Sequence, residues 1–101
     1  MKFDPAEELT DKEALKIISD IVDYGNVRFT DHVEGQMKKR GYNAQDVQYI
    51  LTSGHITQKN FNDKRNNWEY RVEGTDLDGD VGKLITAVIA INRLYIITVL
   101  S

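Results

Sequence analysis

Two adjacent apolar runs near the end of the chain limit the folds that this sequence can adopt. Residues 84–91 read LITAVIAI and residues 94–100 read LYIITVL, with only Asn92 and Arg93 between them. Both runs are apolar at consecutive positions, which is the pattern of strands covered on both faces. A two-residue connection is typical of a β-hairpin, and asparagine tolerates a positive φ there. The sequence therefore predicts two neighbouring antiparallel strands at the centre of a sheet.

Three helices are predicted before these strands. Thr10, with Glu13 three residues later, is a capping-box pattern that starts the first helix. The second helix covers about residues 31–40, where Val33 and Met37 lie four residues apart and form its apolar stripe. The third starts at a similar pair, Asn43 and Asp46, and its inner face is formed by Val47, Ile50 and Leu51. Glycines end the three helices at Gly25, Gly41 and Gly54.

The remaining segments have the alternation of strands. A short strand is predicted around residues 27–29, and a polar strand at residues 55–61 is the predicted sheet edge. In the next strand, Trp68, Tyr70 and Val72 point to one face while Glu69 and Arg71 point to the other. Helices followed by an antiparallel meander predict a single α+β domain over residues 1–101.

The composition excludes several classes of protein. The chain has no cysteine, so disulfides and thiolate metal sites are excluded. No apolar run reaches the roughly 18 residues of a spanning helix, so no membrane association is expected. The first residues are acidic rather than apolar, unlike a secretory signal, and we expect a cytoplasmic protein.

The charge is unevenly distributed along the chain. The formal net charge is −3, which is unlike a strongly basic nucleic-acid-binding domain. The middle of the sequence is nevertheless basic, and it supplies four candidate RNA-binding residues, Lys38, Lys39, Lys59 and Arg65. The alternative is that these cations belong to an ordinary solvated surface.

The second predicted helix carries a candidate catalytic site. His32, Gln36 and Arg40 are spaced four residues apart and form one polar line beside the apolar stripe. The neutral imidazole of a histidine can act as a base or donate a hydrogen bond. The alternatives are that His32 makes a structural hydrogen bond and that Arg40 stabilises the helix by its position near the C-terminal end.

Arg71 is a third candidate, because it lies on the strand face opposite Trp68 and Tyr70. A guanidinium on an open sheet surface can bind a phosphate with two hydrogen bonds. The alternative is a cross-strand ion pair with Glu69 or Glu73 on the same face.

Two further patterns are interpreted as structural. The aromatic residues Phe61, Trp68 and Tyr70 can form a base-stacking surface, but aromatics at a period of two are more typical of a core. The acidic residues around Gly79 lack the spacing of a calcium loop and predict a turn. We therefore expect neither a metal site nor a cofactor.

Residues 24–101 resemble an uncharacterised family of small bacterial domains. In that family the second helix reads T-x-H-A-x-x-R-M-x-x-R-G, and a D-x-D-G turn lies between later strands. The matching positions include Thr30, His32, Met37, Arg40, Gly41, Asp46, Val47, Gly54, Tyr70, Arg71, Val72, Gly74, Asp76, Asp78 and Gly79. Gln36 stands where the pattern has arginine, and residues 1–23 are outside the resemblance and predict an added helix.

This family is similar to the RelE/ParE and BrnT toxins. The resemblance implies helices packed on a four-stranded, mainly antiparallel sheet. Of two functions, the one that the sequence favours is a non-catalytic protein-interaction module, because the predicted edge strand can pair with an antitoxin-like protein or with a second copy of the chain. The other is a metal-independent mRNA endonuclease of a toxin–antitoxin pair, with His32 in acid–base catalysis and with Arg40 and Arg71 stabilising charge. In the interaction module, the acidic N-terminal helix can cover a basic partner or the protein's own basic residues.

Overall fold

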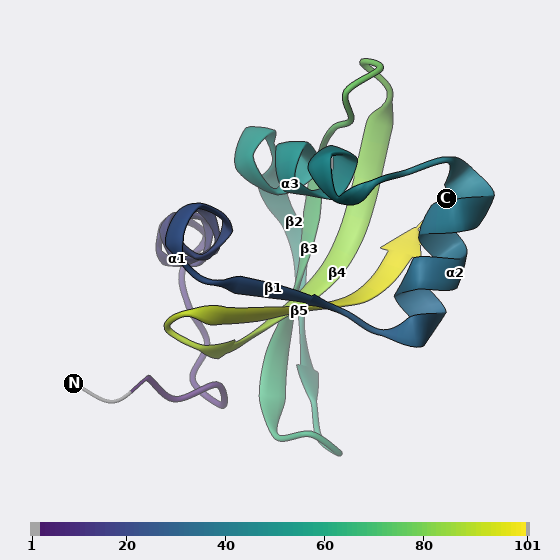
Figure 1. Cartoon of the computed structure of the whole chain (residues 1–101). Coiled ribbons are helices and arrows are strands. Elements are labelled where there is room, and N and C mark those ends of the chain that lie inside the picture. The colour runs from purple at the N-terminus through teal and green to yellow at the C-terminus, as the bar shows by residue number, and fades with distance from the viewer. Residues whose placement is uncertain (1–2, 101) are drawn as a thin grey trace.

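Three helices and five strands form one layered α+β arrangement in the computed structural model, which describes residues 3–100 (Figure 1). The elements in chain order are α1 (Asp11–Tyr24), β1 (Asn26–Phe29), α2 (Asp31–Arg40), α3 (Ala44–Ser53), β2 (His55–Asn62), β3 (Asn67–Thr75), β4 (Val81–Ala90) and β5 (Arg93–Leu100). The predicted α+β class is confirmed.

The sheet has the order β1-β5-β4-β3-β2, so β4 is central and β2 is at one edge, as expected. The pairing of β4 with β5 is antiparallel, as their apolar sequences predicted. The sheet has five strands rather than the four that the resemblance implied, because β1 pairs in parallel with β5. The backbone N–H of Asn26 also donates to the carbonyl of Asn92 at 2.9 Å, so β1 begins beside the β4–β5 turn.

The β4–β5 turn lies one residue earlier than predicted. Ala90 pairs with Arg93, so the two turn residues are Ile91 and Asn92. The β4–β5 register shifts between Val88 and Ala90. Because of this irregularity, the last residue of β4 pairs with Arg93, which the sequence pattern had placed in the turn.

The helix boundaries follow the capping residues. Both predicted capping boxes are formed, with the Thr10 and Asn43 side chains accepting from the third residue of α1 and α3. Thr30 is the N-cap of α2, and its Oγ1 accepts from the Val33 N–H at 3.2 Å. Gly41 follows α2 with a φ of 72°, a left-handed conformation that glycine adopts without strain.

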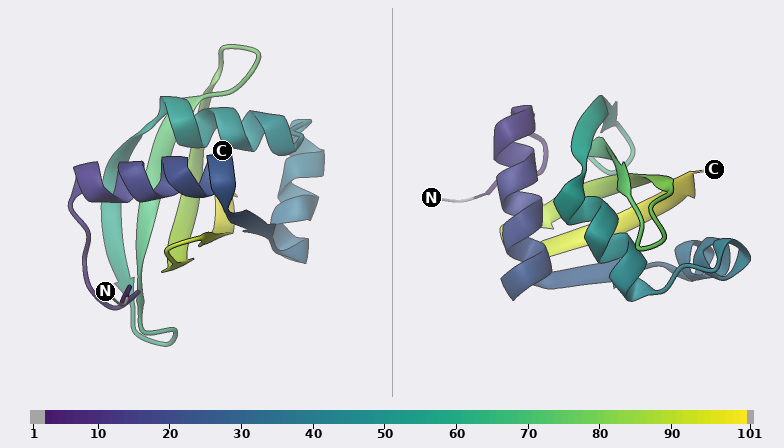
Figure 2. Two further views of the ribbon diagram at one scale, coloured as in Figure 1. Left: turned by 60° about the vertical axis from the view of Figure 1, so that its left-hand side comes forward. Right: turned by 90° about the horizontal axis from the view of Figure 1, so that it is seen from above.

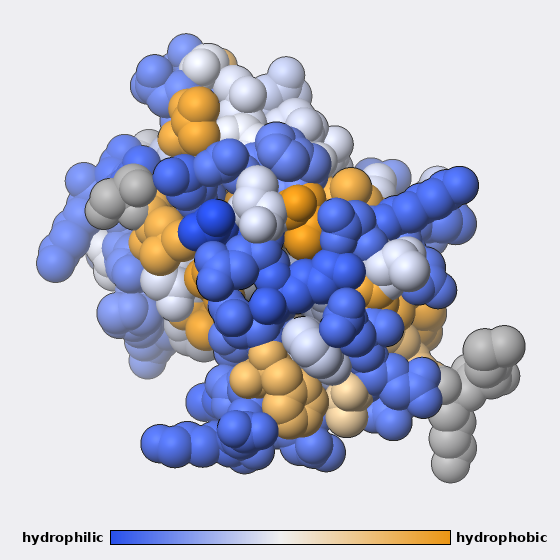
Figure 3. Space-filling model, turned by 180° about the vertical axis from the view of Figure 1, so that it is seen from behind, coloured by the Kyte–Doolittle hydropathy of each residue, from blue (hydrophilic) through white to orange (hydrophobic). Residues whose placement is uncertain are grey.

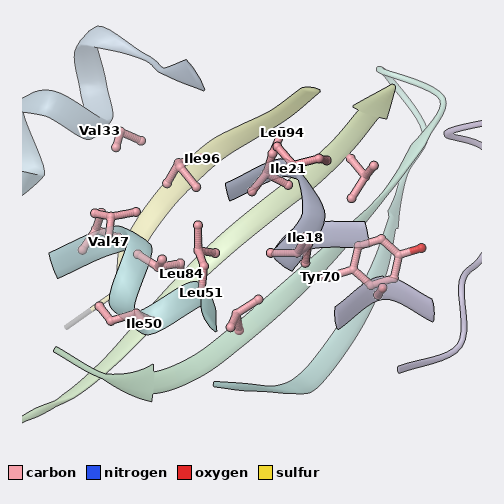
Figure 4. Close-up of a cluster of buried hydrophobic side chains, with 14 of the residues drawn as sticks. Ile18, Ile21, Val33, Val47, Ile50, Leu51, Tyr70, Leu84, Leu94 and Ile96 are labelled. Atoms are coloured by element: carbon pink, nitrogen blue, oxygen red, sulfur yellow. The ribbon is translucent and has the colours of Figure 1, made fainter. Parts of the chain in front are cut away.

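One face of the sheet packs on α1 and α3, which run across it, while α2 lies at the end beyond β1 (Figure 2). A cluster of buried hydrophobic side chains fills the space between these layers (Figure 4). Its most completely buried members are Ile18, Ile21, Val33, Val47, Ile50, Leu51, Tyr70, Val72, Leu84, Val88, Leu94 and Ile96. The predicted inner faces of α2 and α3 are thus confirmed.

The opposite face of the sheet carries a different set of side chains. Glu69 and Arg71 alternate with the buried Tyr70 and Val72 along β3, and Tyr95 alternates with core residues along β5. We call this surface the open face.

None of the helices in residues 3–100 is long and apolar enough to span a membrane.

Candidate functional site

The open face contains a depression of about 330 Å³, which we call the cleft. Three parts of the fold meet there: the start of α2, the β2–β3 hairpin and the middle of β5. Its lining residues are Thr30, His32, Asn62, Arg65, Glu69, Tyr95 and Ile97. The volume is at the lower end of the range for small-molecule sites.

The short strand β1 and the helix cap that follows it place His32 in the cleft. Thr30 follows β1 and is the N-cap of α2, so His32 lies in the first helical turn. Because β1 is paired with β5, this turn lies beside the cleft residues Tyr95 and Ile97. The His32 side chain is exposed, and none of the hydrogen bonds among residues 3–100 involves its ring.

The β2–β3 hairpin positions two other cleft residues through one asparagine. The Asn62 amide donates to the Glu69 carboxylate at 3.0 Å, and the Asn62 carbonyl oxygen accepts from the Arg65 backbone N–H at 3.1 Å. One oxygen of the Glu69 carboxylate is therefore held toward the hairpin. The same asparagine fixes the backbone from which the Arg65 side chain reaches the cleft.

Arg40 does not line the cleft with His32. Eight residues of α-helix separate the two, which is about 12 Å along the helix axis. The Arg40 guanidinium lies over the Tyr42 ring, 5.2 Å from its centroid. Lys38 and Lys39 are exposed in the same last turn of α2.

Arg71 lies on the open face but outside the cleft lining. Its Nε donates to Thr57 Oγ1 at 2.8 Å. Within residues 3–100 it forms no ion pair, whereas Glu73 pairs with Lys83 at 3.5 Å. The structure therefore joins Arg71 to the edge strand β2 through a hydroxyl.

Lys59 is covered by the acidic N-terminal segment. Its Nζ lies 3.0 Å from the Asp11 carboxylate and 3.5 Å from that of Glu8, and it donates to the Leu9 carbonyl at 2.8 Å. The hydrogen bond to Asp11 is the main cause that raises the pKa of Lys59. Among the four candidate RNA-binding residues, Arg65 alone lines the cleft.

The patterns that the sequence analysis interpreted as structural are indeed used in packing. Asp76 is buried, and its carboxylate accepts from the backbone N–H groups of Asp78 and Asp80, both at 2.9 Å. Trp68 packs edge-on against Phe61, and its indole N–H donates to the Ala6 carbonyl at 3.1 Å. In residues 3–100, no group of three acidic or histidine side chains is arranged to hold a metal ion.

Glu69, Asn62 and Tyr95 are cleft residues that the sequence analysis did not select. Alternation along β3 places Glu69 on the face opposite Tyr70, where the sequence predicts it only as an ion-pair partner of Arg71. Tyr95 carries a hydroxyl group within an otherwise apolar run of β5, and this polar group is the sequence feature that could have indicated a site residue. Asn62 had no signal, because its role depends on the hairpin geometry.

Residues 29–101 match a family described as a domain of unknown function, DUF4258. The chain belongs to this family. All of the cleft residues lie inside the DUF4258 region, whereas α1 precedes it. No curated protein and no solved structure gave a significant match.

Proposed function

We propose that this DUF4258 domain is a RelE/BrnT-like domain that binds and cleaves RNA in the cleft without a metal ion. The observation that carries this proposal is the presence of His32, Glu69, Tyr95 and Arg65 in one depression of the open face. These residue types supply the proton-transfer groups and the cation that phosphodiester cleavage requires.

The proposed reaction is attack of a ribose 2′-oxygen on the adjacent phosphorus. Glu69 or His32 removes the 2′-hydroxyl proton, and the 5′-oxygen leaves with a proton supplied by His32 or Tyr95. The products are a 2′,3′-cyclic phosphate and a 5′-hydroxyl. Arg65 stabilises the charge on the phosphate oxygens in the transition state. We assign Arg71 and the basic end of α2, formed by Lys38, Lys39 and Arg40, to flanking phosphates.

The test is cleavage of single-stranded RNA, free and on translating ribosomes, by the wild type and by His32→Ala. We expect the variant to lose about 10²–10⁴-fold in rate, the usual contribution of acid–base catalysis. His55→Ala is the matched control, because His55 is an exposed histidine at the start of β2, outside the cleft.

Arg65→Ala tests the cation in the same assay, with its neighbour Lys64→Ala as a control of equal charge change. Melting curves of all four variants establish that each one folds. An inactive wild type, or equal rates for His32→Ala and His55→Ala, contradicts the proposed catalysis.

A second candidate function is protein interaction, favoured by the position of β2 at the sheet edge. The outer side of β2 can accept a strand from an antitoxin-like protein or from a second copy. Analytical ultracentrifugation tests the second copy, and co-expression with an adjacent antitoxin-like reading frame tests the other partner. A monomer at all concentrations that does not co-purify with such a protein contradicts this function.

A further inference from the structure

A second depression, of about 390 Å³, adjoins the cleft on the open face. Both are lined by Arg65, Tyr95 and Ile97, so a bound molecule can extend from one into the other. We call this depression the side pocket. Its further lining residues are Asp4, Pro5, Asn66, Asn67, Ala87 and Ile89.

The side pocket has mainly apolar side chains along β4 and β5. Ala87 and Ile89 come from β4, and Tyr95 and Ile97 from β5. A flat, weakly polar group fits such a surface, and an aromatic side chain such as Tyr95 can contact its ring face. This is the environment that a nucleobase requires.

Asn67, one of the residues that line the side pocket, has a buried hydrogen-bond acceptor without a partner. It is 2% exposed, and its Oδ1 has no hydrogen-bond partner among residues 3–100. Its Nδ2 makes a 3.4 Å contact with the carbonyl of Trp68. A buried acceptor without a partner is unfavourable, so a ligand that donates to Oδ1 gains by binding there.

The N-terminal segment supplies the wall of the side pocket. Its backbone is held against Trp68, because the Pro5 carbonyl accepts from the Trp68 N–H at 3.0 Å. The neighbouring Asp4 is exposed and adds a carboxylate to the lining. Asp4 Oδ1 accepts from the Ala6 N–H at 2.9 Å, and the second oxygen of this carboxylate is an acceptor that favours a donor group beside Asp4.

We propose that the side pocket binds a nucleobase with an exocyclic amino group, next to the phosphate that lies in the cleft. The amino group donates to Asn67 Oδ1, which reaches it by rotation about the soft χ2 torsion, and to Asp4. Uracil presents an N–H between two carbonyl oxygens, and these oxygens face the acceptors unfavourably. This assignment rests on the proposed RNA function and names the preferred base class.

The experiment is a titration of ¹⁵N-labelled full-length protein with mononucleotides, followed by NMR. The matched ligand pairs are CMP with UMP and AMP with IMP, because the members of each pair differ where the amino group is replaced by an oxo group. We expect CMP and AMP to bind about tenfold more tightly than their partners and to shift the Asn67 side-chain amide signals.

Two variants separate recognition from folding. Asn67→Leu removes the acceptor and should abolish the CMP preference, with Asn60→Leu on the exposed part of β2 as the control. Ile89→Trp fills the side pocket without changing Asn67 and should weaken the binding of all four mononucleotides.

The outcomes distinguish this inference from the proposed cleavage. Equal affinities within both pairs, or no binding of any mononucleotide, overturn the base pocket even if RNA is cleaved. Amino-dependent binding that Asn67→Leu removes supports the pocket even if the wild type cleaves no RNA.

Discussion

The side chain of Gln36 accepts a backbone hydrogen bond at the sheet edge, where β5 has no neighbouring strand. The four residues of β1 pair with Arg93–Ile96, so the last part of β5 has no strand on that side. There the Gln36 Oε1 accepts from the Val99 N–H at 2.8 Å. The helical pattern that this segment resembles has arginine at this position, and arginine has no acceptor. Gln36 therefore makes a backbone contact that arginine cannot make.

Gln36→Ala should destabilise the protein by about 1–3 kcal/mol, because the partly buried Val99 N–H loses its acceptor. Denaturant unfolding measures this change, and hydrogen exchange at Val99 should become faster. Gln45→Ala, at an exposed position of α3, is the control and should have little effect. Equal stability of the two variants would show that the contact is dispensable.

Glu13 makes the capping of α1 sensitive to pH. Its carboxylate accepts from the Thr10 backbone N–H at 2.9 Å, and this hydrogen bond is the main cause that lowers the pKa of Glu13. A lowered folded-state pKa stabilises the fold above the ordinary glutamate pKa of about 4.3. The stabilisation is lost as the pH falls through the folded-state value.

Glu13→Gln should therefore have a lower Tm than the wild type near neutral pH, and the difference should shrink as the pH falls below about 4. Thermal melting across this pH range measures the effect. Glu7→Gln is the control for removing a charge from the same exposed segment. A difference that does not depend on pH would contradict an electrostatic contribution from the cap.

At the scale of elements, α2 is the helix with the narrowest apolar contact. Its buried residues are Val33 and Met37, one helical turn apart, and most of its other positions are exposed. The helix packs on β5 rather than on the middle of the sheet. Because His32 is in this helix, the packing of two side chains determines how firmly one wall of the cleft is held.

Met37→Ala should destabilise the protein by about 2–4 kcal/mol, the usual cost of emptying a core position. Denaturant melting checks this value, with Lys39→Ala on the exposed face of α2 as the control. A change below about 0.5 kcal/mol would mean that Met37 is not part of the core.

At the scale of the whole molecule, the folded unit is larger than the family region. The DUF4258 match covers residues 29–101, yet α1 contributes Ala14, Ile18 and Ile21 to the core. The segment before α1 also contacts β3, where the Leu9 N–H donates to the Tyr70 hydroxyl at 2.9 Å. The N-terminal part is thus integrated into the same core, while its acidic residues cover Lys59.

A chain that begins at residue 25 should fail to fold cooperatively. Each lost isoleucine is worth about 2–5 kcal/mol, and domains of this size are stable by only about 5–15 kcal/mol. Circular dichroism melting and NMR dispersion measure the outcome, and a chain that begins at Phe3 is the control. Cooperative unfolding of the shorter chain at the wild-type temperature would show that α1 is an accessory element. Figure 3 shows that the surface seen from behind is mainly hydrophilic with separate hydrophobic patches. Removal of α1 would add the core side chains that it covers to the exposed apolar surface.

The sequence by itself determined the features that arise between near neighbours in the chain. The capping boxes at Thr10 and Asn43 join residues three positions apart, and Gly41 was identifiable because the left-handed conformation favours glycine. The alternation of Tyr70 and Val72 with Glu69 and Arg71 was readable for a similar reason, since successive side chains of a strand point to opposite faces.

Only the tertiary structure decided which distant segments meet. The parallel pairing of β1 with β5, the one-residue shift of the β4–β5 turn and the contact of Lys59 with Asp11 depend on how whole elements pack. The cleft is the clearest case. His32 and Arg40 share a helix face but lie about 12 Å apart along it. His32, Arg65, Glu69 and Tyr95 line one depression because sheet pairing brings α2, the β2–β3 hairpin and β5 together. A periodic pattern specifies the direction of a side chain within its own element, whereas a site requires the positions of several elements, which the packing of the common core determines.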